Sequence, residues 1–336
     1  MKGPMPEEAR EGGRRQRVAV VAACTFPAPR GSQVLVRAVA EHAAAAGHQV
    51  HLVTYGGDAS YAPPPGVQLH APPARLLRPP VGLGWSKPVH DLRLLRLLRR
   101  VVAEEKIDVI HAHNYEAPLL AYRVRARLGV PVVYHAHNAL ADELATYVAP
   151  GWRRRLAARL GRRLDEQVPR RADHVIALTP ELADFLAGCG VDRGRLTVLP
   201  PLALPDHDPG VPADGGPEAS LPDRDGRRFV ALYAGNLDPY QDLDVLFAAF
   251  ARLRARCPDA VLEVATHDGA WRRRLDPRVA GWVAEGAVRV RVEADFVAVR
   301  RRMAAADVLV CPRSSWSGYP IKLVNYALAG RPVVVA

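Results

Sequence analysis

The sequence predicts an α/β protein with two parallel-sheet domains, and three observations lead to this prediction. The chain has 336 residues, more than a single hydrophobic core usually organises, so two domains are expected. Apolar runs typical of buried strands alternate along it with amphipathic segments of helical spacing. Residues 202–228 are rich in Pro, Gly and Asp without periodicity, which is typical of a linker between two domains.

Composition and the first sixteen residues favour a globular cytoplasmic protein. Hydrophobic residues make up 49% of the chain, and no apolar run approaches the roughly 18 residues of a membrane span. Residues 1–16 are polar and lack the apolar centre of a signal peptide, so they are interpreted as a disordered tail. The four cysteines have no CxxC spacing, so neither a zinc site nor a disulfide framework is predicted.

The net charge of +11 suits an anionic partner, which is a nucleic acid, an acidic membrane surface or a phosphorylated substrate. The arginines concentrate in predicted helices without a helix-turn-helix, zinc-finger or RNP motif, so no nucleic-acid partner is expected. One such helix begins with Trp152, Arg153, Arg154 and Arg155, which fits peripheral contact with the inner face of a membrane. A solvated helix face is the alternative interpretation.

The first domain opens with a strand, a Gly-containing loop, a helix and a second strand. These elements are predicted at residues 17–22, 25–32, 33–46 and 49–54. The loop has no GxGxxG fingerprint, so a nicotinamide or flavin cofactor is not expected. Gly31 would let the backbone approach a ligand and Ser32 would cap the helix, and a purely structural turn is the alternative.

Two successive predicted strands then end in histidine-rich clusters. These clusters are His111-Ala112-His113-Asn114 and His135-Ala136-His137-Asn138. Ligands of open α/β sheets bind at the carboxyl ends of strands, so the imidazoles are predicted to hydrogen-bond sugar hydroxyls or a phosphate. A metal site is disfavoured because no Cys or paired carboxylate accompanies them. One histidine of each pair is expected to point into the neighbouring layer, because side chains alternate along a strand.

The other elements continue the same alternation. In the first domain, a strand at 172–179 leads to a helix at 180–187 that Thr179 caps, and a strand at 196–201 closes the domain. In the second, strands are predicted at 229–236, 260–266, 288–292, 306–310 and 332–335, with helices at about 243–256, 269–283, 295–305 and 321–329. The last two strands are predicted to be buried, and Gly330 to end the last helix.

The ordered set of these pieces resembles the GT-B glycosyltransferases, and within them the large retaining family GT4. The matching pieces are Gly31-Ser32, Gly47-His48, residues 108–113, residues 133–135, residues 172–179, Tyr233-Ala234-Gly235-Asn236, and residues 306–308 through 329–334. They cover nearly the whole chain.

The resemblance implies GT-B architecture, in which two Rossmann-like domains face a cleft. An acceptor domain would span residues 17–201 and a nucleotide-sugar donor domain residues 229–336. Such enzymes generally need no metal or other cofactor. The acceptor and phosphate loop is implied at Gly31, Ser32, His113 and Asn114, and His135 is implied to contact the transferred sugar. Donor contacts are implied at Gly235, Asn236, Gln241, Ser317, Gly318, Tyr319, Pro320, Ile321, Lys322 and Asn325.

The chain departs from the family pattern on the donor side. Ser317 and Asn325 stand where the family usually has a Glu pair, and Asn236 and Gln241 stand where it usually has Arg and Lys. Neutral amides thus replace two cations that neutralise a departing diphosphate, and a charge-assisted hydrogen bond is roughly twice as strong as a neutral one. Lys322 is predicted to restore one positive charge.

The family normally continues beyond Pro332-Val333-Val334 with another strand and several helices. The resemblance therefore implies an incomplete C-terminal domain and weak or no turnover of the chain as it stands.

The function predicted from these observations is a retaining, hexosyltransferase-type glycosyltransferase. It would move a sugar from a nucleotide-diphosphate sugar to a glycan, lipid-linked or small-molecule acceptor. The alternatives are a non-catalytic GT-B-like module that binds a nucleotide or sugar, a sugar-nucleotide epimerase or hydrolase of the same architecture, and a basic nucleic-acid binder.

Overall fold

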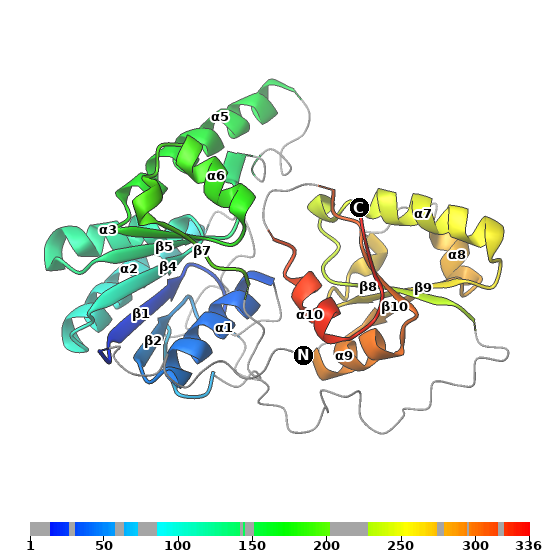
Figure 1. The fold of residues 1–336 in the computed structure, drawn as a ribbon, viewed down its shortest axis with the longest axis horizontal. Helices are drawn as coiled ribbons and strands as arrows, with labels where there is room; N and C mark the ends of the chain where they lie inside the picture. The colour runs from blue at the N-terminus through cyan, green and yellow to red at the C-terminus, as the bar shows by residue number, and fades with distance from the viewer. Residues whose placement is uncertain are drawn as a thin grey trace.

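The computed structural model describes residues 14–26, 31–57, 64–72, 86–141, 144, 151–201, 228–273, 279–293, 296–314 and 319–336. It contains two parallel sheets with helices on both faces, one built from each half of the chain (Figure 1). Most of the predicted tail and linker lies outside the described residues, as do Ser317 and Gly318 of the predicted donor loop.

The first sheet has seven parallel strands in the order β3-β2-β1-β4-β5-β6-β7. The strands are β1 (Arg17–Ala22), β2 (Gln49–Val53), β3 (Val67–His70), β4 (Val109–His113), β5 (Val132–Ala136), β6 (His174–Ala177) and β7 (Leu196–Val198). The helices are α1 (Gly31–Ala45), α2 (Lys87–Glu104), α3 (Glu116–Leu128), α5 (Trp152–Gln167) and α6 (Pro180–Gly188). The order reverses direction at β1 and β4, the type of position where α/β sheets bind ligands.

Alternate residues of β1 face two different cores. Ala19 and Val21 pack with apolar residues of α2, α3 and α6, whereas Val18, Val20 and Ala22 pack with α1. A parallel strand buried on both faces needs apolar residues at nearly every position, which explains the run Arg17–Ala22.

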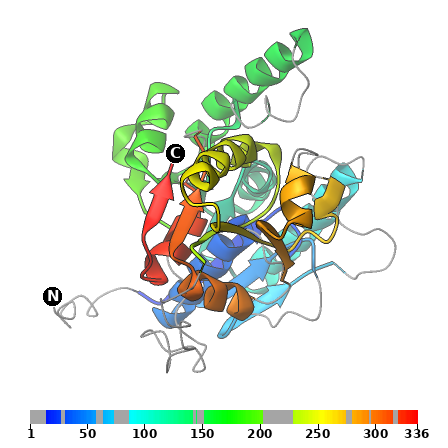
Figure 2. The same ribbon diagram turned by 90° about the vertical axis from the view of Figure 1, so that its right-hand side faces the viewer.

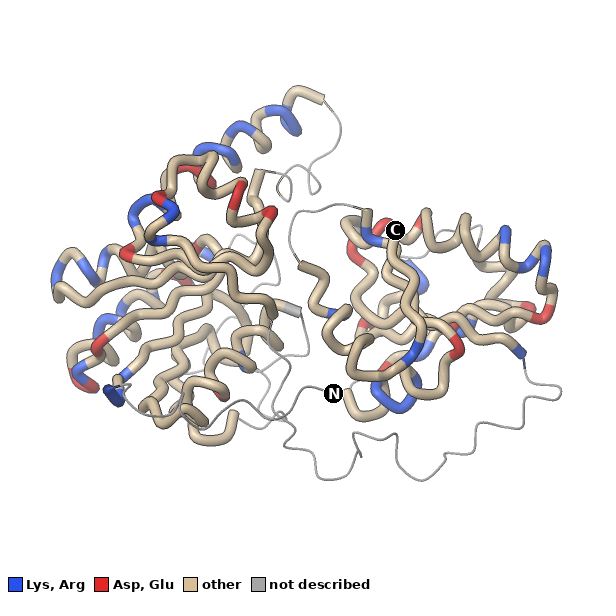
Figure 3. The backbone as a smooth tube through the Cα atoms, in the orientation of Figure 1, with Lys and Arg blue, Asp and Glu red and all other residues tan. Residues whose placement is uncertain are grey.

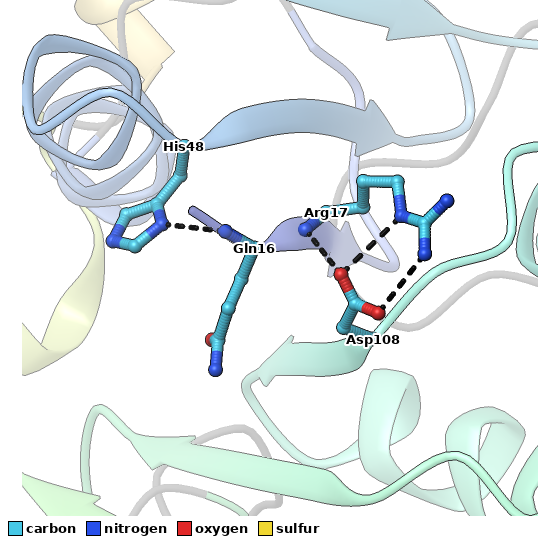
Figure 4. A network of polar contacts seen from close by, with 4 residues as sticks. All are labelled: Gln16, Arg17, His48 and Asp108. Carbon is cyan, nitrogen blue, oxygen red and sulfur yellow. Dashed lines mark hydrogen bonds and ion pairs between the residues drawn. The ribbon is translucent and has the colours of Figure 1, made fainter. Parts of the chain in front are cut away.

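An aspartate before a strand pins the register of each sheet. The Asp108 carboxylate accepts hydrogen bonds from the Arg17 backbone N–H at 2.8 Å and from the Arg17 guanidinium at 3.2 and 3.3 Å (Figure 4). The same figure shows the backbone N–H of Gln16 donating to Nδ1 of His48. Because His48 directly precedes β2, this hydrogen bond links the start of β1 to its other neighbouring strand. Asp173 accepts from the Val132 N–H at 2.8 Å and Asp307 from the Val230 N–H at 2.7 Å. These aspartates therefore have a structural role at the strand ends opposite the predicted ligand site.

The second sheet has five parallel strands in the order β10-β9-β8-β11-β12. The strands are β8 (Val230–Ala234), β9 (Val261–Thr266), β10 (Val288–Val292), β11 (Val308–Cys311) and β12 (Val333–Val335). The helices are α7 (Leu243–Arg256), α8 (Ala280–Ala284), α9 (Phe296–Ala305) and α10 (Lys322–Leu328). One core joins the sheet to α7 and α8, and another joins it to α9 and α10.

Three local predictions differ from the structure. Strand β12 forms as predicted, but its valines are 37–56% exposed because it is the edge of the sheet and its outer side has no neighbour among the described residues. Ser32 is not the cap of α1, because the helix already begins at Gly31. The helix predicted at 269–283 is represented by a 3₁₀ turn at Trp271–Arg273 and the short α8, with residues 274–278 outside the described residues.

A small apolar cluster joins the two halves. Leu35 and Val39 of α1 and Leu178 after β6 pack against Tyr319 and Ile321, directly before α10. Figures 1 and 2 both place α5 at an outer edge of the molecule. In the part of the chain that the structure describes, no helix is both long and apolar enough to cross a membrane.

Candidate functional site

Four histidines gather on one face of the first sheet: His111 and His113 on β4, His135 on β5 and His137 just past the end of β5. His113 pairs in register with His135, and His111 and His137 each lie two residues away along their own segments. Residues two apart share a face, so the prediction that one histidine of each pair points into the other layer is wrong. The ring centroids of His111 and His113 are 4.7 Å apart, and those of His113 and His135 are 4.9 Å apart.

Hydrogen bonds join the four rings in two pairs. His111 Nε2 lies 3.1 Å from His135 Nδ1, and His113 Nδ1 lies 2.9 Å from His137 Nε2. The buried Nε2 atoms of His113 and His135 have no hydrogen-bond partner among the described residues. A buried polar atom without a partner is rare and calls for an explanation, such as a bound water, an ion or a catalytic role.

Burial keeps these imidazoles neutral at physiological pH. It lowers the pKa of His111 to about 4 and that of His137 to about 3. The pKa values of His113 and His135 are also lowered well below the ordinary value by burial and by the neighbouring rings. Neutral imidazoles donate and accept hydrogen bonds and can ligate a metal, but they do not attract a phosphate as a cation would.

The other residues predicted for the acceptor side occupy the same edge of the sheet. Asn114 follows β4 with a φ of 61°, a left-handed conformation that is uncommon for a residue other than glycine. Such backbone strain clusters at binding sites, where the surrounding structure maintains it. Gly31 begins α1, and Ser32 is exposed in the first turn of that helix.

On the second sheet, the ammonium of Lys322 lies among groups from three segments. Its Nζ donates to Gln241 Oε1 at 2.6 Å and lies 4.1 Å from the centroid of the Tyr233 ring. A Cβ added to Gly235 would lie 3.1 Å from this Nζ, a contact so tight that the Lys322 side chain would have to move by a few tenths of an ångström. Burial lowers the pKa of Lys322 to about 7; the neighbouring Cys311 opposes this shift, and the repulsion of Arg313, the smallest influence, adds to it.

The loop after β8 is held by its own hydrogen bonds. The side-chain Nδ2 of Asn236 donates to the Asp238 carboxylate at 2.9 Å and to the Tyr240 hydroxyl at 2.7 Å. The side-chain Oδ1 of Asn236 is buried without a partner among the described residues. The Tyr233 hydroxyl donates to the Asn236 backbone carbonyl at 2.5 Å. The Tyr326 hydroxyl accepts from the Ala234 N–H at 2.8 Å, which anchors α10 to the end of β8.

The structure thus gathers the predicted donor residues Gly235, Gln241 and Lys322, and Asn236 follows directly in the chain. The predicted donor residues that flank Lys322 in the sequence are all half-buried, namely Tyr319, Pro320, Ile321 and Asn325. Asn325 lies about one helical turn after Lys322 on α10. Tyr233 was absent from the predicted site, and His111 and His137 belonged to the predicted histidine clusters without an individual role. The HxH spacing on consecutive strands was the signal for the two histidines, because that spacing places both on one face.

Helix α5 presents the apolar and basic surface that its sequence predicted. Trp152 is 69% exposed, and Leu156 and Leu160 are 58% and 54% exposed. Arginines occupy much of the same helix (Figure 3). Asp165 near its end is buried and accepts hydrogen bonds from the backbone N–H groups of Leu140 and Ala141, which fixes α5 to the first sheet.

Comparison with known proteins identifies relatives over both halves. A family model for the glycosyl transferase 4-like domain matches residues 30–201, and one for glycosyl transferases group 1 matches residues 228–336. The chain is 29% identical over 274 residues to D-inositol 3-phosphate glycosyltransferase of Rhodococcus jostii, covering 76% of this chain and 58% of that protein. The corresponding protein of Nocardia farcinica is 30% identical over 75% of this chain and 57% of its own length. The chain therefore spans less than two thirds of the length of these relatives.

Solved structures share the fold at lower identity. Sucrose-phosphate synthase from Thermosynechococcus elongatus superposes with a TM-score of 0.72 at 19% identity, over 96% of this chain and 81% of that one. Anabaena HepE in complex with UDP-glucose superposes with a TM-score of 0.68 at 14% identity, over 96% of this chain and 80% of that one. The two parallel sheets with their covering helices are therefore a GT-B fold, and the chain belongs to the glycosyl transferase 4-like family.

Proposed function

We propose that this chain transfers a sugar, with retention of anomeric configuration, from a nucleoside-diphosphate sugar to an acceptor hydroxyl in glycan or glycolipid biosynthesis. The proposal assigns acceptor binding to residues 17–201 and donor binding to residues 229–336, and it requires no metal for the transfer. It is supported by membership of the family and by fold neighbours solved with UDP-glucose and with ADP and acarbose.

The observation that carries the proposal is the enclosed ammonium of Lys322. A departing diphosphate needs a nearby cation, and the loop after β8 offers the neutral amides of Asn236 and Gln241 at the positions where the family usually has cations. Lys322 brings its Nζ to Gln241 and to the close approach at Gly235. A charge in such a partly dehydrated place acts more strongly on an anion than it would in water.

In the proposed reaction, the bond between the anomeric carbon and the diphosphate oxygen breaks while the acceptor oxygen bonds to that carbon on the same face. Lys322 stabilises the charge that develops on the diphosphate, and the proton of the acceptor hydroxyl passes to the departing phosphate oxygen. Asn325 hydrogen-bonds a ribose hydroxyl. Residues Ser317, Gly318, Tyr319, Pro320 and Ile321 complete the donor side.

On the acceptor side, we assign contact with the transferred sugar to His135, supported by its buried Nε2 without a described partner. Gly31, Ser32, His113 and Asn114 surround the acceptor and phosphates. His137 lies just past the end of β5, where it could contact the transferred sugar in place of His135. The kcat values of His135→Gln and His137→Gln should therefore be compared. A lowered kcat in His137→Gln alone would move the sugar contact to His137.

The test of the donor site is nucleotide binding by thermal shift in the presence of EDTA, against UDP, GDP, ADP and their sugar conjugates. One nucleotide is expected to raise the Tm of the wild type, and Lys322→Ala to abolish the rise. Lys87→Ala is the matched control, because Lys87 lies 5.4 Å from the centroid of the Tyr55 ring in the first sheet and is expected not to affect binding. Removing one group that stabilises a developing charge typically costs about 10²- to 10³-fold in kcat, and Lys322→Ala is expected in that range.

A non-catalytic module that binds a nucleotide is the alternative function, favoured by the neutral residues that replace the family's charged ones. Nucleotide binding with no sugar transfer to any acceptor would select it. Absence of binding by all nucleotides would reject the donor site altogether.

We also propose that α5 contacts an anionic membrane on its cytoplasmic side through Trp152, Arg153, Arg154 and Arg155. The exposed Trp152 and the adjacent guanidinium groups are the combination that interfacial helices use. Wild type should sediment with vesicles containing anionic lipid and the triple charge reversal to Glu should not. Equal sedimentation of both would reject this contact.

A further inference from the structure

Two positively charged side chains from the segment after β11 contact the loop that follows β8. The guanidinium carbon of Arg313, two residues past β11, lies 5.5 Å from the centroid of the Tyr240 ring. The next residue of the loop, Gln241, accepts a hydrogen bond from Lys322 Nζ at 2.6 Å. Neither the aromatic ring nor the amide carries a negative charge, so these two contacts hold the cations without neutralising them.

The backbone around Arg313 is anchored on both sides. Before it, β11 pairs with β8, with Leu309 opposite Leu232. After it, Ser314 donates from its backbone N–H and its hydroxyl to the Asp242 carboxylate, at 2.8 and 2.7 Å. Asp242 has a φ of 51°, a left-handed conformation that costs free energy and that the surrounding contacts maintain. The segment that carries the Arg313 side chain is therefore fixed against the loop after β8.

Both contacts lie at the end of the second sheet where a ligand is expected to bind. β9 lies on one side of β8 and β11 on the other, so the strand order reverses direction between β8 and β11. In open α/β sheets, ligands bind beyond the carboxyl ends of the strands at such a reversal. Tyr240 and Gln241 follow β8, and Arg313 and Lys322 follow β11, so both cations belong to segments that leave the sheet at this point.

We propose that Arg313 binds the diphosphate of the donor as a second cation beside Lys322. This inference rests on the proposed function and deepens it, because it assigns a second charged contact to the donor. Asn236 and Gln241 are neutral where the family usually has Arg and Lys. The pair of Arg313 and Lys322 restores both charges from the segment after β11 instead of the loop after β8.

The two groups have complementary chemistry toward a diphosphate. An arginine presents its N–H groups in a planar fork that donates two parallel hydrogen bonds to phosphate oxygens, whereas a lysine acts as a point charge. Arg313 therefore orients the diphosphate, and Lys322 stabilises the charge that develops on the departing oxygen.

The charges of this pair favour an anion as the ligand. Burial and, as the smallest influence, the repulsion of Arg313 lower the pKa of Lys322. Like charges placed close together destabilise each other, and such arrangements are common at functional sites. A diphosphate that contacts both groups replaces this repulsion by two attractions.

The experiment is calorimetric titration of UDP, GDP and ADP into the full chain in the presence of EDTA. The diphosphate that binds is then compared with its own monophosphate. Arg313→Gln is expected to weaken binding of the diphosphate by about 10- to 100-fold, the range for losing a hydrogen bond to a charged group. The loss for the monophosphate is expected to be smaller, because it lacks the second phosphate group.

Further variants separate the charge of Arg313 from its position. Arg313→Lys keeps the charge without the planar fork, so its affinity for the diphosphate should lie between those of Arg313→Gln and the wild type. Tyr240→Phe keeps the ring beside the guanidinium and should retain more affinity than Tyr240→Leu, which removes it. Arg254→Gln is the matched control and should bind like the wild type, because Arg254 lies in the last turn of α7 and pairs with Glu285 at 3.0 Å.

The possible failures of this inference and of the proposed function differ. Unchanged affinity of Arg313→Gln for the diphosphate, with or without a lower Tm, would overturn the inference and leave the donor site at Lys322 standing. An equal loss for the monophosphate would also overturn it, because the effect would not depend on the second phosphate. Absence of nucleotide binding by the wild type would reject the donor site itself, and this inference with it.

Discussion

The two sheets have similar backbones and opposite chemistry at their ligand-facing ends. β4 and the segment around β5 present four neutral imidazoles, of which His111 is half-buried and the other three are buried, whereas the end of β8 approaches an enclosed ammonium on α10. In both sheets an aspartate at the other end of the strands pins the neighbouring strand through its backbone N–H. The comparison teaches that the shared fold provides the positions, and that a few side chains beyond the strand ends decide which ligand each half can bind.

The largest expected effect is acid destabilisation of the first sheet. The pKa of His111 is lowered to about 4 and that of His137 to about 3, so below pH 6.5 the unfolded chain binds protons that the folded chain does not. The free energy of unfolding should therefore fall as the pH drops from 6.5 towards 4, by about 1.4 kcal/mol per pH unit for each such histidine. Urea denaturation between pH 7 and 5 measures this slope.

The variant that tests this prediction is His111→Gln, which should reduce the slope by about one proton. Identical slopes in wild type and His111→Gln would show that the cluster does not respond to pH as a buried neutral set.

The next largest effect concerns the buried carboxylate that attaches α5 to the first sheet. Asp165→Ala would remove the acceptor of the Ala141 N–H and one of two acceptors each of the Leu140 N–H and the Tyr115 hydroxyl. Denaturant unfolding should show a loss of about 3–5 kcal/mol. Asp184→Ala, which breaks an exposed pair with Arg193, should change stability by less than about 1 kcal/mol. A small effect of Asp165→Ala would mean that α5 is held mainly by its apolar contacts.

In the second sheet, protein stability and nucleotide affinity should both depend on the titration of Lys322, at higher pH than the histidines of the first sheet, and should change in opposite directions. The pKa of Lys322 is lowered from 10.5 to about 7, so between these values the unfolded chain binds more protons and the stability of the free protein should rise with pH. Nucleotide affinity should fall over the same range, by up to about tenfold per pH unit, because the ammonium is lost. Lys322→Met should flatten both profiles. Falling stability of the wild type relative to Lys322→Met between pH 7 and 10 would contradict the assignment.

The smallest effect compares one buried tyrosine hydroxyl from each sheet. Tyr326→Phe removes the acceptor of the Ala234 N–H, and Tyr122→Phe removes a donor to the Val168 carbonyl at 2.6 Å. Each should cost about 1 kcal/mol, with Tyr326→Phe the larger because it leaves a buried N–H unpaired. Thermal unfolding measures both, and a larger loss for Tyr122→Phe would reverse the order.

Much of the fold was predictable from local pattern. The apolar strands, the helix that Thr179 caps by accepting from the Leu182 N–H, and the Gly330 turn after α10 all form where the sequence places them. Exposure was less predictable, because β12 has the same run of valines as an interior strand and lies at the edge. A strand's residues record its propensity, whereas its place in the sheet depends on residues far away in the chain.

The sequence by itself determined the α/β class, the order of the elements and the two sets of chemically active residues at strand ends, since these depend on periodicity and turn chemistry within short windows. Only the tertiary structure decided that four histidines share one face, because that requires the pairing of His113 with His135. It also decided that Lys322 meets Gln241 and Gly235, which are more than eighty residues away in the chain. Such meetings follow from strand pairing and helix packing, so spacing along the chain cannot reveal them.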